Sequence, residues 1–239
     1  MKNMNTESET TELSVVDPSM SLVEAVSKRR SVRGFLDKEV PQQVINRIFE
    51  IAQQAPSNCN VQPWKAYVAS GELKESLKKK MYENTTNRVS PNPDYSYTNN
   101  FENEYRTRQV ECAVALYSKM GIGREDKEGR MRAVLRNFEF FDAPHIAFIG
   151  MDPSFGTTVA VDVGMWAQTL MLTMVAFGLH SCPMGTMRNY PDLVRQAFDV
   201  EDGTKILFGI SFGYEDSALP ANETRTTRDA TSSNVVFQS

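Results

Sequence analysis

Arginine, hydroxyl and amide side chains gather in three stretches of the chain whose chemistry suits one anionic, planar ligand. Residues 29–33 read Arg-Arg-Ser-Val-Arg, and residues 225–228 read Arg-Thr-Thr-Arg. Guanidinium forks and hydroxyls are well suited to binding a phosphate. Residues 56–64 read Pro-Ser-Asn-Cys-Asn-Val-Gln-Pro-Trp, and their amides suit the edge of a heterocycle. Together the three stretches predict a nucleotide-like cofactor.

Each stretch also has a simpler explanation when it is taken alone. The arginines at 29–33 would be a solvated helix end, favoured by the helix dipole. The amides Asn58, Asn60 and Gln62 would be turn residues that bind their own backbone, and Trp64 is expected to be a core side chain in either case. The combination of all three stretches favours the cofactor interpretation.

Other common catalytic patterns are absent from the sequence. No Gly-x-Gly-x-x-Gly follows a predicted strand and no Walker-type loop occurs, which argues against a Rossmann dinucleotide site and against an NTPase. His145 and His180 have no Ser or Asp arrangement typical of hydrolases, so both are interpreted as structural. Cys59 has no basic partner in the sequence and is interpreted as a small filler rather than a nucleophile. We therefore expect no catalytic side chain of the hydrolytic kind.

Charge and cysteine content narrow the class of protein further. The 239-residue chain has a net charge of -4, which argues against a nucleic-acid role because phosphate backbones attract basic surfaces. The three cysteines are widely spaced and form no Cys-x-x-Cys pair, so neither a disulfide framework nor a metal site is predicted. A reducing, cytoplasmic location fits this usage best.

One apolar stretch approaches the length of a membrane span. Residues 159–179 are interrupted by Asp162, Gln168 and several small residues, so we expect a buried helix and no membrane association. A lone buried carboxylate is costly, and Asp162 is therefore expected to be hydrogen-bonded in an architectural role. The polar residues 1–19 are expected to form a flexible tail ahead of a single domain, 20–239.

Hydrophobic periodicity predicts the elements that must position the three stretches. A capping serine at 21 and helical spacing predict a first helix that brings residues 29–33 to its end. Further helices are predicted at 41–55, 72–82, 102–119, 125–140, 158–178 and 192–198. Strands are predicted at 64–68, 144–151 and 205–214, with a short strand or loop at 181–187. This pattern indicates an α+β fold with a small central sheet.

The three stretches, in this order, resemble the nitroreductase family of FMN-dependent oxidoreductases, and the likeness runs from Ser21 to Arg228. The motifs that carry it are Arg-Arg-Ser-x-Arg, Pro-Ser-x-x-Asn-x-Gln-Pro-Trp, the Asp-bearing apolar helix that ends in Gly178-Leu179, and the late Gly-Tyr followed by Arg-Thr-x-Arg. The resemblance implies a mainly antiparallel sheet flanked by helices, in an intertwined homodimer with two FMN sites at the interface. The apolar residues 235–237 in a C-terminal arm, 215–239, would then wrap the partner subunit.

The resemblance also implies roles for individual residues. Those that would hold the phosphate, ribityl chain and ring edge of FMN are Arg29, Arg30, Ser31, Arg33, Arg225 and Arg228. Those that would line the flavin from the other subunit are Pro56, Ser57, Asn58, Asn60 and Gln62. The backbone of Pro183, Met184 and Gly185 would cross the ring near its reactive nitrogen, where an amide can stabilise the charge of reduced flavin without a catalytic side chain.

Members of this family pass hydride from NADH or NADPH to FMN and then to a second acceptor in ping-pong order. A nitroaromatic acceptor is the leading expectation, with quinone, enone or flavin reduction at the same site as an alternative. A flavin-binding protein without reductase turnover is the alternative from another class. Residues 84–140 depart from the commonest family pattern and are expected to shape the pocket for a small aromatic acceptor, with Tyr95, Tyr97 and Phe138 as candidate contacts and core packing as their alternative.

Overall fold

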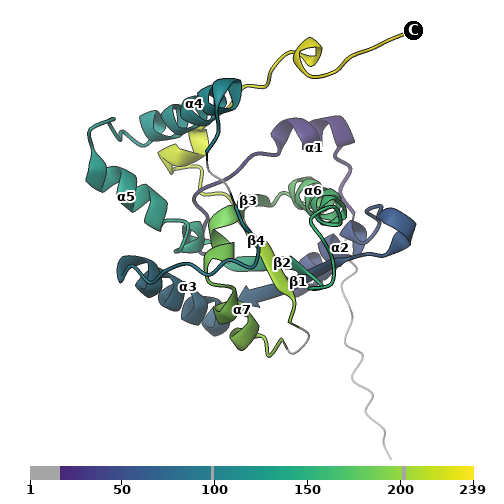
Figure 1. Ribbon diagram of the computed structural model, residues 1–239, viewed down its shortest axis with the longest axis horizontal. Coiled ribbons are helices and arrows are strands. Elements are labelled where there is room, and N and C mark those ends of the chain that lie inside the picture. Colours follow the sequence, from purple (N-terminus) through teal and green to yellow (C-terminus); the bar gives the residue numbers. More distant parts are fainter. Residues whose placement is uncertain (1–16, 98–99, 201–202) are drawn as a thin grey trace, which may run out of the picture.

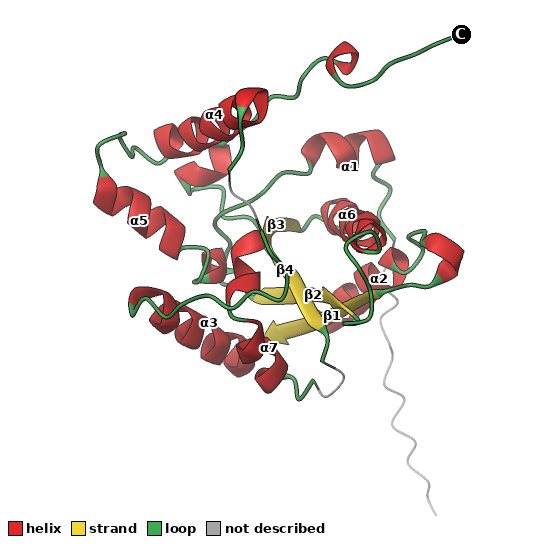
Figure 2. Ribbon diagram, viewed as in Figure 1, coloured by secondary structure: helices red, strands yellow, loops and turns green. Residues whose placement is uncertain are grey.

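Four antiparallel strands form the centre of the structure, in the order β1-β2-β4-β3. The computed structural model describes residues 17–97, 100–200 and 203–239. The strands are β1 (Trp64–Ser70), β2 (His145–Met151), β3 (His180–Met184) and β4 (Lys205–Gly213). Helices surround this sheet, as Figures 1 and 2 show. The α+β class and the small antiparallel sheet predicted from the sequence are confirmed.

The helices are divided between the two faces of the sheet. In chain order they are α1 (Leu22–Lys28), α2 (Gln42–Ala52), α3 (Gly71–Thr86), α4 (Asn103–Lys119), α5 (Lys127–Leu135), α6 (Ala160–Ala176) and α7 (Pro191–Ala197). Figure 1 shows α1, α2 and α6 on one side of the sheet and α3 and α7 on the other. Helices α4 and α5 lie farther out, and α4 contacts the C-terminal segment (Figure 1).

Strand β2 shows why both faces of the sheet are covered. All seven of its residues are buried. Its side chains alternate between two hydrophobic clusters: Ala147 and Ile149 belong to the cluster with α2 and α6, whereas Ile146 and Phe148 belong to the cluster with α3 and α7. This alternation follows from the two-residue period of a strand. An apolar strand without polar alternation is therefore central, as its sequence indicates.

A β-bulge in β2 depends on a glycine. The pairing between β2 and β4 shifts between Ile149 and Gly150. A Cβ at position 150 would lie 2.5 Å from the carbonyl oxygen of Lys205, a separation that no side chain tolerates. Glycine therefore lets the two backbones approach where the register changes.

Several predicted boundaries differ from the structure for local reasons. Helix α1 ends at Lys28, because Arg29 has left the helical region with ψ 122°. The helix predicted over 125–140 ends at Leu135, and residues 140–142 then form a turn with φ values of 54°, 55° and 63°. The stretch predicted as a strand or loop at 181–187 is β3 followed by a 3-10 turn, Gly185–Asn189. Local strain of this kind leaves no trace in hydrophobic periodicity.

Helices α4 and α5 form the excursion predicted at residues 84–140. Neither helix has a buried residue, and even their apolar side chains are in water: Tyr105, Val114 and Met131 are each at least 57% exposed. Helix α4 is attached to the C-terminal segment by an ion pair between Lys119 and Glu223, 2.9 Å apart. This excursion therefore leaves apolar surface uncovered in a single chain.

The predicted flexible tail, 1–19, falls mostly outside the described residues. Asp17 is described, and its carboxylate accepts two hydrogen bonds from Arg47 on α2, at 2.8 and 2.6 Å. No described helix has the length and apolarity needed to cross a membrane. The apolar stretch at 159–179 is the buried helix α6, as predicted.

Candidate functional site

The first arginine stretch lies along the free edge of β3, the outermost strand of the sheet. Val32 is fully buried, and its N–H donates to the carbonyl oxygen of Ser181 at 3.0 Å. Ser31 and Ser181 form a parallel bridge at the same place. The buried valine and the two backbone contacts therefore fix Ser31 and Arg33, which are half-buried, beside the edge of the sheet.

Asn222 joins the first arginine stretch to the last one. Its side-chain oxygen accepts from the backbone N–H of Arg33 at 2.7 Å. Its amide group donates to the carbonyl oxygens of Gly34 at 2.8 Å and Asp216 at 2.9 Å. The side chain is 4% exposed, so these bonds are made away from water. Sequence reasoning missed Asn222, because a single asparagine in an aperiodic tail carries no signal of a contact 189 positions away.

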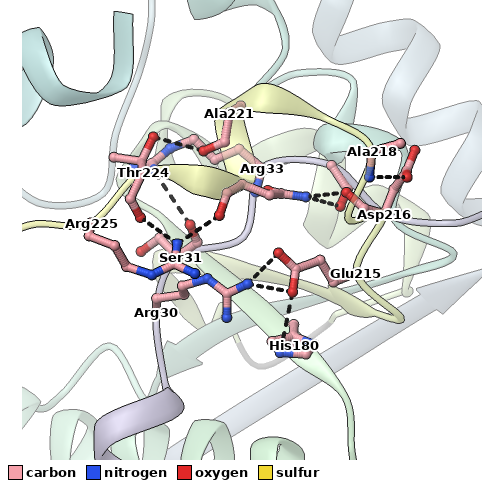
Figure 3. A network of polar contacts seen from close by, with 12 residues as sticks. Arg30, Ser31, Arg33, His180, Glu215, Asp216, Ala218, Ala221, Thr224 and Arg225 are labelled. Carbon is pink, nitrogen blue, oxygen red and sulfur yellow. Dashed lines mark hydrogen bonds and ion pairs between the residues drawn. The ribbon is translucent and has the colours of Figure 1, made fainter. Parts of the chain in front are cut away.

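The joined stretches form a cluster of cations without a counter-charge. Among the described residues, no carboxylate pairs with Arg29, Arg33, Arg225 or Arg228. Burial lowers the pKa of Arg29, and the nearby charge of Arg228 lowers it further. Arg225 instead donates to the carbonyl oxygens of Asn222 at 2.8 Å and Thr224 at 3.0 Å, which orients its guanidinium (Figure 3). Cations held together against their own repulsion form a site for an anion.

Arg30 behaves differently from the other arginines. Its guanidinium donates to both oxygens of the Glu215 carboxylate, and Nε2 of His180 lies 3.6 Å from the same carboxylate (Figure 3). The Arg30 and Glu215 side chains are 22% and 13% exposed. The charge of Arg30 is thus already neutralised within the chain. Only Nη2 makes these bonds, and Nε is buried without a hydrogen-bond partner. The role of Arg30 at the phosphate therefore stays a prediction, for an arginine whose charge is already paired.

The amide-rich loop has a strained backbone that is held in place by one buried carboxylate. Cys59, Asn60 and Gln62 have φ values of 49°, 57° and 51°, in the left-handed region. The N–H of Asn58 donates to a carboxylate oxygen of Asp162 at 3.1 Å. Asp162 lies on α6 and is 8% exposed, so the expectation that it is buried and hydrogen-bonded is confirmed. Strained backbone that persists in this way is common at ligand sites.

The structure does not bring the amide loop to the arginine cluster within one chain. The side chains of Asn58, Asn60 and Gln62 are exposed. No hydrogen bond or ion pair between described residues joins this loop to residues 29–33 or 225–228. In Figure 1 the loop after α2 lies to the right of α6, whereas residues 29–33 run to the left from α1. The three predicted stretches therefore form two separate surfaces of this chain.

Residues 183–185 lie at the end of the edge strand. Met184 is 2% exposed and Pro183 and Gly185 are exposed, so the backbone turns outward at this point. The neighbouring thiol of Cys182 is buried, and burial raises its pKa to about 11. A protonated, inaccessible thiol is not a nucleophile. The role predicted for the backbone at 183–185 stays a prediction.

The three aromatic residues predicted to contact an acceptor have different environments. Tyr97 is 52% exposed, and Tyr95 is half-buried against the core with its hydroxyl lacking a hydrogen-bond partner. Phe138 is 3% exposed and packs against Tyr190, with ring centroids 6.3 Å apart. The structure therefore favours the alternative for Phe138, a core aromatic side chain. Its burial makes Phe138 unsuited to contact an acceptor in this chain.

A half-buried arginine near Tyr97 also escaped the sequence reasoning. The guanidinium carbon of Arg188 lies 3.4 Å from the centroid of the Tyr97 ring. A Cβ at position 185 would lie 3.4 Å from Nη1 of Arg188, so this guanidinium borders Gly185 as well. Arg188 therefore links the loop after α3 to the end of β3. No local motif in the sequence marks it.

The two histidines are placed as structural residues. Nε2 of His145 accepts from the backbone N–H of Val40 at 3.1 Å, so its proton is on Nδ1, which faces Ser70 Oγ at 2.5 Å. In this tautomer the imidazole cannot take a proton from Ser70. Burial lowers the pKa of His145 to about 4, and burial also lowers the pKa of His180. Both rings are therefore neutral at pH 7.

Comparisons with known proteins agree on one family. A model described as the Nitroreductase family matches residues 26–214. Nitroreductase NfnB of Mycolicibacterium smegmatis is 34% identical over 226 residues, covering 92% of this chain and 95% of that protein. A 4-nitrobenzoate reductase of Pseudomonas putida is 33% identical, covering 85% of this chain and 89% of the relative.

Solved structures give the same result. The FMN-dependent nitroreductase NfnB from Mycobacterium smegmatis in complex with NADPH superposes with a TM-score of 0.86 at 33% identity, covering 92% of this chain and 100% of that one. The FMN and NADPH-dependent nitroreductase NfnB from Sphigopyxis sp. strain HMH superposes with a TM-score of 0.88 at 33% identity, with the same coverage.

Proposed function

Because this chain belongs to the nitroreductase family, we propose that it is an FMN-dependent oxidoreductase that transfers hydride from NADPH or NADH to nitroaromatic compounds in ping-pong order. The observation that carries the proposal is the cluster of arginines without carboxylate partners along the edge of β3, held together by Asn222. Such a cluster is suited to the phosphate of a mononucleotide.

The residues of the cluster suit the phosphate of FMN in charge and in hydrogen-bonding capacity. Arg29, Arg225 and Arg228 supply cations for a phosphate, and the half-buried Ser31 and Arg33 supply polar groups nearer to the sheet edge. Ser181 Oγ is buried without a hydrogen-bond partner next to this segment, so a donor or acceptor is available there. Arg30 holds Glu215 beside His180, and its remaining donors stay candidates for a contact with the cofactor.

FMN supplies the hydride chemistry when bound, since it accepts hydride from a nicotinamide and passes it to an acceptor. The chain contributes orientation and electrostatics. The segment 183–185 ends an edge strand of the sheet, and an N–H of Met184 or Gly185 directed at the flavin would stabilise negative charge without itself titrating. The buried thiol of Cys182 stays protonated beside this segment, because burial raises its pKa to about 11.

We further propose that the active species is a homodimer. Apolar side chains are exposed on elements that border the two candidate surfaces: Leu22, Val23 and Val26 on α1, Val161 and Met165 on α6, and Val236 and Phe237 in the C-terminal arm. A monomer rarely leaves so many apolar side chains in water. A second copy that covers them would also supply a partner's amide loop, which supports the interpretation that two chains complete each site.

The acceptor class follows from the relatives, whose names include nitrobenzene, chloronitrobenzene and 4-nitrobenzoate reductases. These share a nitro group on a benzene ring and differ in charge. We propose a small nitroaromatic acceptor, with Tyr95 and Tyr97 as the aromatic contacts. All three thiols are free, which supports a reducing, cytoplasmic location.

The test is an anaerobic spectral titration of the purified protein. We expect a yellow flavin spectrum that bleaches on addition of NADPH or NADH and returns on addition of nitrobenzene. A protein that takes up no FMN would contradict the cofactor assignment. A flavin that bleaches but does not recover with any nitroaromatic would contradict the acceptor assignment and favour a quinone panel next.

A further inference from the structure

Arg188 borders the candidate site and has no role in the FMN assignment. Its side chain is half-buried, yet among the described residues no carboxylate pairs with it. Asp94 of the adjoining loop and Asp192 of α7 both accept hydrogen bonds from Arg195, at 2.8 and 2.6 Å. The charge of Arg188 is thus left unneutralised while its neighbours are paired.

The guanidinium is held in one orientation by Tyr97. It lies 3.4 Å from the centroid of the tyrosine ring, a cation-π contact that covers one of its flat faces. Face stacking leaves the edge of the guanidinium free, and the edge carries the N–H groups that bind a carboxylate in a bidentate manner. The Tyr97 ring therefore orients the guanidinium of Arg188 without using its N–H donors.

The segment that carries Tyr97 is attached to the element that carries Arg188. The N–H of Asn92 donates to the carbonyl oxygen of Asn189 at 3.0 Å. Asp94 accepts from the backbone N–H of Ile206 at 2.8 Å, in addition to its bond with Arg195. These contacts fix the loop against the 3-10 turn and against β4, so the stacked pair is built into the fold.

The location of the guanidinium gives it a function. Position 185 is glycine, and a Cβ there would lie 3.4 Å from Nη1 of Arg188. No side chain therefore separates the guanidinium from the backbone at 183–185, the segment assigned to the reactive edge of the flavin. An aromatic acceptor that lies there beside Tyr97 has its ring substituents within reach of a fixed cation.

We propose that Arg188, oriented by Tyr97, forms an anion subsite that selects aromatic acceptors bearing a carboxylate over neutral ones. This inference rests on the proposed function, because it places the acceptor at the flavin edge. The phosphates of the nicotinamide donor share the anionic chemistry, and the experiment separates the two sources. The proposal commits to the acceptor, because a single guanidinium edge matches a planar carboxylate and because an aromatic partner is already in place.

The first measurement is binding, which needs no turnover. Benzoate and benzamide, which lack the nitro group, are titrated into the oxidised, flavin-loaded protein and followed through the flavin absorption band. In Arg188→Gln we expect the Kd for benzoate to rise about 10- to 100-fold, the usual worth of a charge-assisted bidentate contact, and the ratio of benzoate to benzamide affinity to collapse. Arg188→Lys keeps the charge without the planar fork, so its Kd for benzoate is expected to lie between those of the parent and of Arg188→Gln.

The second measurement compares acceptors in steady state. The ratio of kcat/KM for 4-nitrobenzoate to that for nitrobenzene is determined at fixed NADPH in each variant. We expect this ratio to fall about 10-fold or more in Arg188→Gln and to fall less in Tyr97→Phe, which keeps the ring face, than in Tyr97→Leu. Lys80→Gln, which removes one charge from an exposed site on α3, is the matched control and keeps the ratio of the parent.

The outcomes are separable from failure of the proposed function. Unchanged benzoate affinity and an unchanged acceptor ratio in folded, flavin-loaded Arg188→Gln would overturn the subsite. A variant that loses discrimination between NADPH and NADH in the reductive half-reaction, while the acceptor ratio stays constant, would overturn it in favour of a donor-phosphate site. If the parent protein reduces neither nitro compound but binds benzoate through Arg188, the subsite stands and the proposed acceptor chemistry fails.

Discussion

The arginines at the edge of β3 are informative because, apart from Arg30, they have no carboxylate partner among the described residues. Burial and the charge of Arg228 both lower the pKa of Arg29, so the two guanidiniums are close and no carboxylate offsets them. Repulsion of this kind costs stability and is retained where an anion relieves it. Arg30, the next residue along the chain, is paired with Glu215 and shows the contrast.

Substitution of Arg228 tests this contrast. Arg228→Gln removes a cation that is exposed and makes only local hydrogen bonds to Thr226 and Thr227. We expect the Kd for FMN, measured by quenching of flavin fluorescence, to rise about 10- to 100-fold with little loss of folding stability, because one charge-assisted contact is lost. Lys80→Gln carries the same charge change on α3. Equal FMN affinity in the two variants would show that Arg228 does not bind the phosphate.

His145 supplies a residue-scale prediction about pH. Burial, with a smaller contribution from the charge of Lys74, lowers its pKa from an ordinary value of 6.5 to about 4. The folded state therefore binds the proton less readily than the unfolded state. The contribution of His145 to the free energy of unfolding is therefore fully present above pH 6.5, where His145 is neutral in both states. This contribution decreases as the pH falls toward 4, and the loss is about 3 kcal/mol at most.

Urea unfolding across this pH range measures the effect. Many carboxylates titrate in the same window, so the useful quantity is the difference between the parent and His145→Gln, whose side-chain oxygen can still accept from the N–H of Val40. We expect the parent to lose more stability than the variant between pH 7 and pH 4. Parallel curves would mean that protonation of His145 is not linked to unfolding.

At the scale of elements, the loop after α2 illustrates how a helix can hold a binding segment. Asp162 lies in the first turn of α6 and accepts from the N–H of Asn58 at the start of three left-handed residues. One buried carboxylate thus holds a strained backbone whose amide side chains remain exposed. The only acidic residue of this apolar helix therefore stabilises the loop.

Removal of this carboxylate is expected to release the loop. Asp162→Ala leaves the N–H of Asn58 without its acceptor, which costs about 1–3 kcal/mol of folding stability. If this loop lines the flavin of a partner chain, FMN affinity falls as well. Asp162→Asn keeps an acceptor oxygen and serves as the control. Normal FMN binding by a destabilised Asp162→Ala would separate the loop from the cofactor site.

At the scale of the whole molecule, one chain presents two incomplete surfaces. The arginine cluster lies along β3, and the amide loop lies beyond α6. Exposed apolar residues on α1 and in the C-terminal arm border this arrangement, with Val23 77% and Phe237 84% exposed. A second copy would bury these side chains, and burial of apolar area is the main driving force for such an association.

Charges placed in these patches test the dimer. We expect Val23→Asp combined with Phe237→Asp to raise the dimer Kd at least about 10-fold in sedimentation velocity, because an unpaired carboxylate is costly in an apolar interface, and to lower FMN content in parallel. Leu73→Asp, on α3 at the opposite face of the sheet, is 37% exposed in the parent and is the control. A dimer that tolerates all three substitutions equally would place the interface elsewhere.

Much of the fold was predictable because the signals are local. Seven helices and four strands among the described residues agree with the periodicity in type and order, and Asp162 was expected to be hydrogen-bonded because a buried charge must be. The errors are also local in origin. Residues 140–142 turn in the left-handed region, and Phe138 enters the core, since an aromatic residue beside a loop carries the same sequence signal in either role.

The sequence by itself determined the class of ligand, because residue type sets charge and hydrogen-bonding capacity: arginines and hydroxyls for a phosphate, amides for a ring edge, and no pattern for hydrolysis. Only the tertiary structure decided which of these groups are available. In the structure Arg30 is paired with Glu215, 185 positions away, and Asn222 joins the two arginine stretches. Arg188 stacks on Tyr97. These contacts depend on how strands and loops that are far apart in the sequence pack together. Hydrophobic periodicity is a local pattern and does not predict them.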